Sequence, residues 1–139
     1  MANKIGVIGL GYVGLPLAVE FGKQFSTVGY DINSKRIEEL IKGIDCTGET
    51  SKRNIKSSLK LWLSSDLNDL KGCNIYIISV PTPVDKNNIP NLNILFSATS
   101  MIASLLKKGD IVIYESTVYP GCTEEDCVPI LEKESRLKY

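Results

Sequence analysis

The chain has 139 residues, a length typical of one domain, and 43% of them are hydrophobic, which is enough for a buried core. Sixteen basic and sixteen acidic residues cancel, so the charge favours neither nucleic acid nor an anionic membrane as a partner. No apolar run approaches the roughly 20 residues of a membrane span, and there is no signal-peptide pattern. Four cysteines without zinc-type spacing, in a chain without histidine, predict reduced thiols, no metal site and a cytoplasmic location.

A strand-like apolar segment, residues 4–8, runs into glycines spaced G-x-G-x-x-G at Gly9, Gly11 and Gly14. In a strand–turn–helix unit that binds a dinucleotide, the first glycine permits the tight turn and the second lets the backbone approach the pyrophosphate. The third lets the helix pack close to the strand. The free N–H groups at the start of the helix then favour phosphate. A plain strand-to-helix turn is the alternative, but the strand before the glycines and the helical spacing after them favour a dinucleotide.

A second strand is predicted for residues 26–31, and it ends on Asp31, 17 positions after Gly14. This is close to the usual spacing of the carboxylate that binds the adenine ribose. An acid there favours NAD, because it would repel the additional phosphate of NADP. Alternatively, Asp31 only turns the chain and caps a helix that begins near Ser34, and the two roles are compatible. Arg36, at the head of that helix, would lie over the adenine or reach the ribose, unless it is a solvated surface arginine.

The middle of the chain has weaker patterns. Residues 43–60 are polar and predict a loop with a short helix, followed by a weak strand at 61–63 and a short helix near Leu67. Residues 73–80, in contrast, form a nearly continuous apolar run. Such a run is typical of a central parallel strand that is covered on both faces.

Two prolines follow this strand in the sequence Pro81-Thr82-Pro83. They fix the backbone and hold the Thr82 hydroxyl where it could face the cofactor, although a purely structural role would also explain them. A helix is predicted from about Leu92, with an apolar face that includes Leu95 and Met101. We interpret this Met and Leu stripe as core and not as part of a cofactor site.

Residues 110–115 are the next predicted buried strand. Thr123 followed by Asp126 predicts a capping box at the start of a helix that Pro129 kinks or restarts. The alternation of strands and helices predicts an α/β fold, namely a Rossmann-type, doubly wound, mainly parallel sheet with helices on both faces. Because such a sheet normally continues further, we expect residues 1–139 to be an NAD-binding domain truncated before a central helix and a substrate domain.

Four motifs carry a resemblance to a known family: GLGYVGLPLA, Tyr30-Asp31, VPTP and ESTVYPGCTEE. In this order they closely resemble the nucleotide-sugar 6-dehydrogenases, which include the UDP-glucose and UDP-N-acetylhexosamine dehydrogenases. The resemblance covers essentially the whole chain, but only the family's N-terminal cofactor domain. ESTVYPGCTEE is most similar to the bacterial branch that acts on UDP-N-acetylhexosamines for capsule, Vi-antigen or O-antigen polysaccharides. A UDP-glucose 6-dehydrogenase is the alternative within the family.

The resemblance implies an activity and a set of site residues. The whole protein would oxidise the sugar C6 alcohol of a UDP-sugar to a carboxylate with two NAD, through a thioester on a cysteine, and would be a homodimer. Thr117 would lie near the nicotinamide and the reacting carbon and help to position a catalytic water. The predicted cofactor-binding residues are Gly9, Gly11, Tyr12, Val13, Gly14, Asp31, Arg36, Pro81, Thr82, Ser116 and Thr117.

The family's catalytic cysteine, lysine, asparagine and glutamate belong to motifs that this chain does not contain. None of its cysteines matches the nucleophile's motif. Cys122, at a predicted helix N-terminus where its pKa could be lowered, is expected to be structural by its position in the family. The chain by itself is therefore expected to bind NAD without turnover.

Two interpretations outside this family remain. Another Rossmann enzyme, such as a β-hydroxyacid or phosphogluconate-type dehydrogenase, shares the glycine pattern, but VPTP and ESTVYPG speak against it. A non-catalytic NAD-binding sensor or regulatory module is compatible with all these residues, because the chemistry would lie in other segments.

Overall fold

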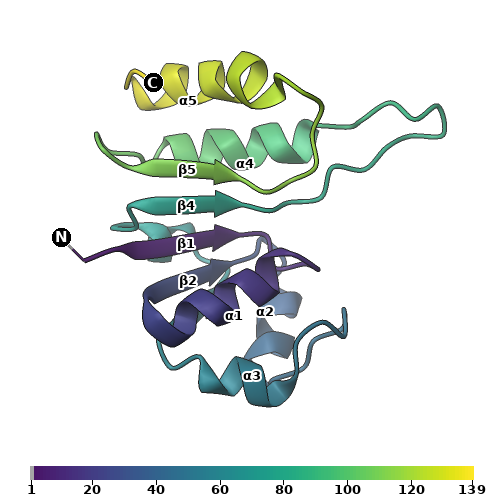
Figure 1. Ribbon diagram of the computed structural model, residues 1–139, viewed down its shortest axis with the longest axis vertical. Helices are drawn as coiled ribbons and strands as arrows, with labels where there is room; N and C mark the ends of the chain where they lie inside the picture. The colour runs from purple at the N-terminus through teal and green to yellow at the C-terminus, as the bar shows by residue number, and fades with distance from the viewer. Residues whose placement is uncertain (1) are drawn as a thin grey trace.

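The computed structural model describes residues 2–139. In chain order the elements are β1 (Lys4–Ile8), α1 (Gly14–Gln24), β2 (Ser26–Tyr30), α2 (Ser34–Ile41), α3 (Lys52–Ser57), β3 (Leu61–Ser64), η1 (Leu67–Leu70), β4 (Ile75–Ile78), α4 (Asn93–Ala103), β5 (Ile111–Tyr114), η2 (Thr123–Cys127) and α5 (Val128–Ser135). Within the described residues, the five strands form one all-parallel sheet in the order β3-β2-β1-β4-β5. Figure 1 shows four of them, β2, β1, β4 and β5, side by side. The predicted Rossmann-type fold, including the weak third strand, is confirmed.

Successive residues of a strand point to opposite faces of the sheet, and both faces are covered. Ile5 and Val7 of β1 belong to a core with the apolar sides of α1, α2 and α3. Ile8 belongs to the opposite core, which η1 and α4 complete, and α5 packs against α4 (Figure 1). Each fully buried aliphatic side chain contributes about 1.5–3 kcal/mol. Burial on both faces therefore explains why the central strands are apolar at almost every position.

The carboxyl ends of three strands meet at one edge of the sheet. Ile8 of β1 lies beside Tyr30 of β2 on one side and beside Ile78 of β4 on the other. Along the chain, β2 and β3 are added on one side of β1, and β4 and β5 are then added on its other side. The order in which strands join the sheet therefore reverses between β1 and β4. In open α/β sheets, ligands bind in the crevice outside such a reversal point.

After β4, residues 83–91 project from this same edge as an arm (Figure 1). Its two sides pair in antiparallel fashion at Val84 and Pro90, and the N–H of Asn91 donates a 2.7 Å hydrogen bond to the carbonyl of Pro83. No helix in the described residues is both long enough and apolar enough to cross a membrane.

The last helical region differs from the sequence-based prediction. The predicted capping box is wrong: η2 is a π-helix, its N-cap residue is Cys122, and no side chain caps it. The Asp126 carboxylate instead accepts a hydrogen bond from the Tyr119 hydroxyl. α5 then starts at Val128 with Pro129 in its first turn, where a missing N–H costs little. The restart at Pro129 is confirmed.

Candidate functional site

The glycine turn after β1 has three glycines with different reasons to be glycine. Gly9 has φ +92°, and a Cβ on Gly14 would lie 1.7 Å from the carbonyl oxygen of Gly9. The protein's own backbone therefore requires these two. A Cβ on Gly11, in contrast, would meet nothing within 4 Å. The protein's own packing does not require Gly11 to lack a side chain, and the open space above it fits the close approach of a pyrophosphate.

Asp31 follows β2 and faces the glycine turn. Its Oδ2 accepts a 3.0 Å hydrogen bond from the N–H of Leu10, and its Oδ1 accepts a 2.9 Å bond from the N–H of Asn33. Asp31 therefore turns the chain, but Asn33 is the residue that caps α2, since its side chain accepts from the backbone of Lys35 and Arg36. A carboxylate offers about four acceptor positions, so Asp31 retains capacity for ribose hydroxyls.

Arg36 is not a solvated surface arginine. It is 7% exposed, and its guanidinium donates to the carbonyl of Leu10 and to the carboxylate of Asp45. The guanidinium also donates to Sγ of Cys46, so the side chain is held against the glycine turn by three partners.

The loops after β4 and β5 are joined by two hydrogen bonds between them. The Thr82 hydroxyl donates to the carbonyl of Thr117, and the Ser116 hydroxyl donates to the carbonyl of Val80, each at 2.7 Å. The Thr82 proton is therefore directed at the neighbouring loop, and the oxygen of Thr82 remains available as an acceptor. Each loop fixes the other where both leave the sheet.

The glycine turn, the segment from Tyr30 to Arg36, the start of the loop after β4 and one side of α4 surround a cavity of about 460 Å³ at the carboxyl ends of β1, β2 and β4. Its size is within the range of small-molecule and cofactor sites, about 300–1,000 Å³. Of the predicted site residues, Gly9, Gly11, Asp31, Arg36 and Pro81 line it.

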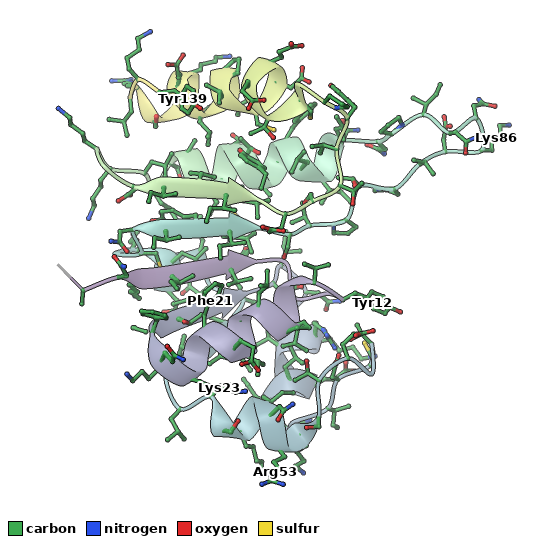
Figure 2. All side chains as sticks on the ribbon, in the orientation of Figure 1. Tyr12, Phe21, Lys23, Arg53, Lys86 and Tyr139 are labelled. Carbon is green, nitrogen blue, oxygen red and sulfur yellow. The ribbon has the colours of Figure 1, made fainter. Side chains whose placement is uncertain are left out.

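The other predicted residues do not line the cavity. Tyr12 and Val13 are exposed and directly follow Gly11, which lines the cavity. Figure 2 shows that Tyr12 and Lys86, at the end of the arm, both project beyond the carboxyl ends of the strands. Gly14 is buried. Thr82, Ser116 and Thr117 lie in the adjoining braced loops.

Sequence reasoning missed several lining residues. Ile32, which is 85% exposed, directly follows Asp31, and Ile94, Ser97 and Met101 line the cavity from α4. Ile32 could have been predicted from the sequence, because it is a large apolar residue that stands after the end of the predicted strand, where burial in the sheet does not explain it. Met101 also packs against the core, so the predicted core stripe serves both purposes.

A larger cavity, about 650 Å³, lies between β5, α5 and the residues that follow α5. No predicted site residue lines it, and it contains no phosphate-binding turn. In residues 2–139 no three His, Cys, Asp or Glu side chains are grouped as a metal ion would require. Cys122 is fully buried, and burial raises the pKa of its thiol, contrary to the lowered pKa that a helix N-terminus suggested.

Residues 3–139 match the NAD-binding domain of the UDP-glucose/GDP-mannose dehydrogenase family. The chain is 57% identical to a UDP-N-acetyl-D-glucosamine 6-dehydrogenase from Pseudomonas aeruginosa and 52% identical to one from Salmonella typhi, over 98% of its own length and 32% of theirs. It matches the structure of the UDP-D-ManNAc dehydrogenase from Pyrococcus horikoshii with a TM-score of 0.91 and 37% identity, covering 98% of this chain and 33% of that one. The chain thus spans about a third of these relatives' length, and it belongs to the UDP-glucose/GDP-mannose dehydrogenase family as its NAD-binding domain.

Proposed function

We propose that this chain is the NAD-binding part of a UDP-N-acetylhexosamine 6-dehydrogenase, which oxidises the sugar C6 alcohol to a carboxylate for a bacterial surface polysaccharide. The observation that carries the proposal is the meeting of the open glycine turn and the Asp31 carboxylate at one crevice. Two relatives at 57% and 52% identity bear the name UDP-N-acetyl-D-glucosamine 6-dehydrogenase, which supports the substrate class.

The proposed roles at the adenine end follow from the contacts. The backbone N–H groups of Gly11, Tyr12, Val13 and Gly14 would bind the pyrophosphate at the positive end of α1. Asp31 would accept hydrogen bonds from the ribose hydroxyls and repel the additional phosphate of NADP. NAD, when bound, supplies the hydride acceptor for the sugar.

We propose that the nicotinamide binds next to the loops after β4 and β5, which two hydrogen bonds join. Pro81 and Thr82 from the first loop, with Ser116 and Thr117 from the second, would form its wall. The two hydrogen bonds between these loops support a wall of fixed shape. Positioning of this kind limits the freedom of the reactants before the reaction. Thr117 would help to position a water molecule near the reacting carbon.

The whole protein would act on a UDP-sugar as a cytoplasmic homodimer, with residues 1–139 as its dinucleotide-binding domain. UDP-glucose is the second candidate substrate, since the family's description includes UDP-glucose dehydrogenases.

The experiment is calorimetric titration of NAD and NADP into the chain. We expect NAD to bind, and NADP to bind at least about tenfold more weakly because of the like charge at Asp31. A protein of the relatives' length that carries this chain is then given NAD with UDP-N-acetylglucosamine or UDP-glucose. We expect two NADH for each N-acetylhexosamine. Oxidation of UDP-glucose alone would overturn the substrate class, and no NAD binding would overturn the proposal itself.

A further inference from the structure

Arg36 has all of its directional contacts inside the protein. Its Nε and Nη2 donate to the carbonyl of Leu10 at 3.1 and 2.8 Å, and Nη2 also donates to Oδ1 of Asp45 at 2.7 Å. Nη1 donates to Sγ of Cys46 at 3.2 Å. Only a guanidinium has the planar arrangement of donors that can hold a carbonyl and a carboxylate at the same time. Arg36 therefore connects the glycine turn to the loop between α2 and α3.

Asp45 is just as fully engaged. Its side chain is 1% exposed and accepts hydrogen bonds from Arg36, from the N–H and hydroxyl of Thr47, and from the N–H of Thr50. Burial alone would raise the pKa of Asp45, but these hydrogen bonds outweigh it and lower the pKa to about 2. Asp45 is therefore a fixed negative charge at neutral pH. It faces Arg36 and not the cavity, which it does not line.

Both backbone polar groups of Leu10 are consequently held by buried or half-buried side chains. Asp31 binds its N–H, Arg36 binds its carbonyl, and its own side chain is fully buried. Leu10 immediately precedes Gly11, above which the space is open. The direction of the Leu10 carbonyl sets the plane of the peptide that carries the Gly11 N–H, because the peptide unit is planar.

We propose that Asp45 and Arg36 are positioning residues for the pyrophosphate. Asp45 orients the Arg36 guanidinium, and Arg36 fixes the Leu10–Gly11 peptide so that the N–H groups of the turn face the ligand before it binds. Preorganisation of this kind increases affinity because the turn need not be ordered on binding. This inference rests on the dinucleotide site proposed above.

The first test is Asp45→Asn in the 139-residue chain, with NAD binding measured by calorimetry. We expect the dissociation constant of NAD to rise about tenfold or more, as for loss of a hydrogen bond to a charged group. The matched control is Glu20→Gln, which breaks the exposed ion pair between Glu20 and Lys23 and should leave NAD affinity within about twofold. If the unchanged chain fails to bind NAD, the proposed function fails. If it binds and Asp45→Asn binds equally well, only this inference fails.

The second test separates positioning of the turn from a general loss of folded protein. Adenosine has the base and ribose but no phosphate, so its affinity, measured by NMR titration, should be nearly unchanged by Asp45→Asn while NAD affinity falls. Loss of adenosine and NAD in the same proportion would overturn the inference. So would unchanged hydrogen exchange of the Leu10 and Gly11 amides, which we expect to become faster in the variant.

The third test uses Arg36→Lys, which keeps the cation but has a single nitrogen and so cannot reproduce the separate contacts of Nε, Nη1 and Nη2. It also serves if Asp45→Asn does not fold. We expect a similar loss of NAD affinity for Arg36→Lys. The double variant should bind NAD about as weakly as the weaker single variant, because the two residues act as one unit. Normal NAD affinity of Arg36→Lys, or fully additive losses in the double variant, would overturn the inference.

Discussion

The N–H of Leu10 and Oδ2 of Asp31 lie 3.0 Å apart and form a hydrogen bond between residues 21 positions apart in sequence. This bond ties the acid after β2 to the glycine turn after β1. The proposed ribose ligand and the proposed pyrophosphate cradle therefore have a fixed position relative to each other. A change at either residue should affect both parts of the site.

Asp31→Ala removes the proposed ribose ligand and also releases the Leu10 N–H. A hydrogen bond to a charged group contributes about 1.5–3 kcal/mol, so we expect NAD affinity to fall tenfold to a hundredfold by calorimetry. The control is Asp66→Ala, because Asp66 accepts a similar backbone hydrogen bond from Asn68 but does not line the cavity. NADP binding to the unchanged chain that equals or exceeds NAD binding would contradict the assignment of Asp31.

Gly11→Val and Gly14→Ala should fail in different ways. Gly11 has no positive φ and open space around it, so Gly11→Val should keep its melting temperature and lose NAD binding. Gly14→Ala forces a Cβ to within 1.7 Å of the Gly9 carbonyl oxygen, so the variant should lose stability, by about 1–3 kcal/mol or more. Thermal melts followed by NAD titration distinguish the two. A folded Gly11→Val chain with normal NAD affinity would show that the pyrophosphate does not bind there.

The order of elements could be predicted because each is specified locally. Apolar runs mark β1 and β4, and the glycine spacing marks the turn into α1. The sequence spacing between Gly14 and Asp31 predicted that the two residues lie close together, because a βαβ unit places both at the same edge of the sheet. The capping box failed, since Asp126 bonds to the Tyr119 hydroxyl and η2 widens to a π-helix.

The contacts of Arg36 could not be predicted for a different reason. Its partner Asp45 lies in the polar segment 43–60, which has no periodic pattern that would indicate burial. The bracing of Thr82 and Ser116 depends likewise on the adjacency of β4 and β5, so it follows from the sheet order and not from spacing in the sequence. Local patterns thus indicated the glycine turn and Asp31, which line the cavity, better than the residues that hold them in place.

The stability of the chain should depend on pH through Asp45, whose pKa is about 2 when folded against an ordinary 3.8. A pKa that is lower in the folded state stabilises the protein above the unfolded pKa, and this stabilisation is lost as pH falls through the folded pKa. We expect Asp45→Asn to reduce the free energy of unfolding by about 2 kcal/mol at neutral pH. The difference from the unchanged chain should shrink from about pH 4 to about pH 2.

Urea unfolding of the two proteins across this pH range measures the difference. Glu20→Gln is again the control, because Glu20 is exposed and its ion pair with Lys23 should contribute only about 0–1 kcal/mol. A gap between Asp45→Asn and the unchanged chain that stays constant from neutral pH to pH 2 would mean that the folded pKa of Asp45 is not lowered.

The last prediction is that the 139-residue chain binds NAD without oxidising a sugar. It has no histidine, and burial raises the pKa of the Cys73 and Cys127 thiols to about 11 and that of Cys122 as well, so these thiols are poor nucleophiles. Hydride transfer also requires a sugar held at reacting distance, and such positioning accounts for roughly 7–11 kcal/mol of barrier. The proposed site residues would contact the dinucleotide and not the sugar, apart from Thr117. NAD at about 100 times its dissociation constant should therefore stabilise the chain by about 2.7 kcal/mol, seen as a higher melting temperature. The same sample with UDP-sugars should give no NADH absorbance. At the same NAD concentration the Asp31→Ala chain, whose affinity is tenfold to a hundredfold lower, should be stabilised by only about 0.4–1.4 kcal/mol. NADH formed by the purified chain would show that catalytic residues lie within it.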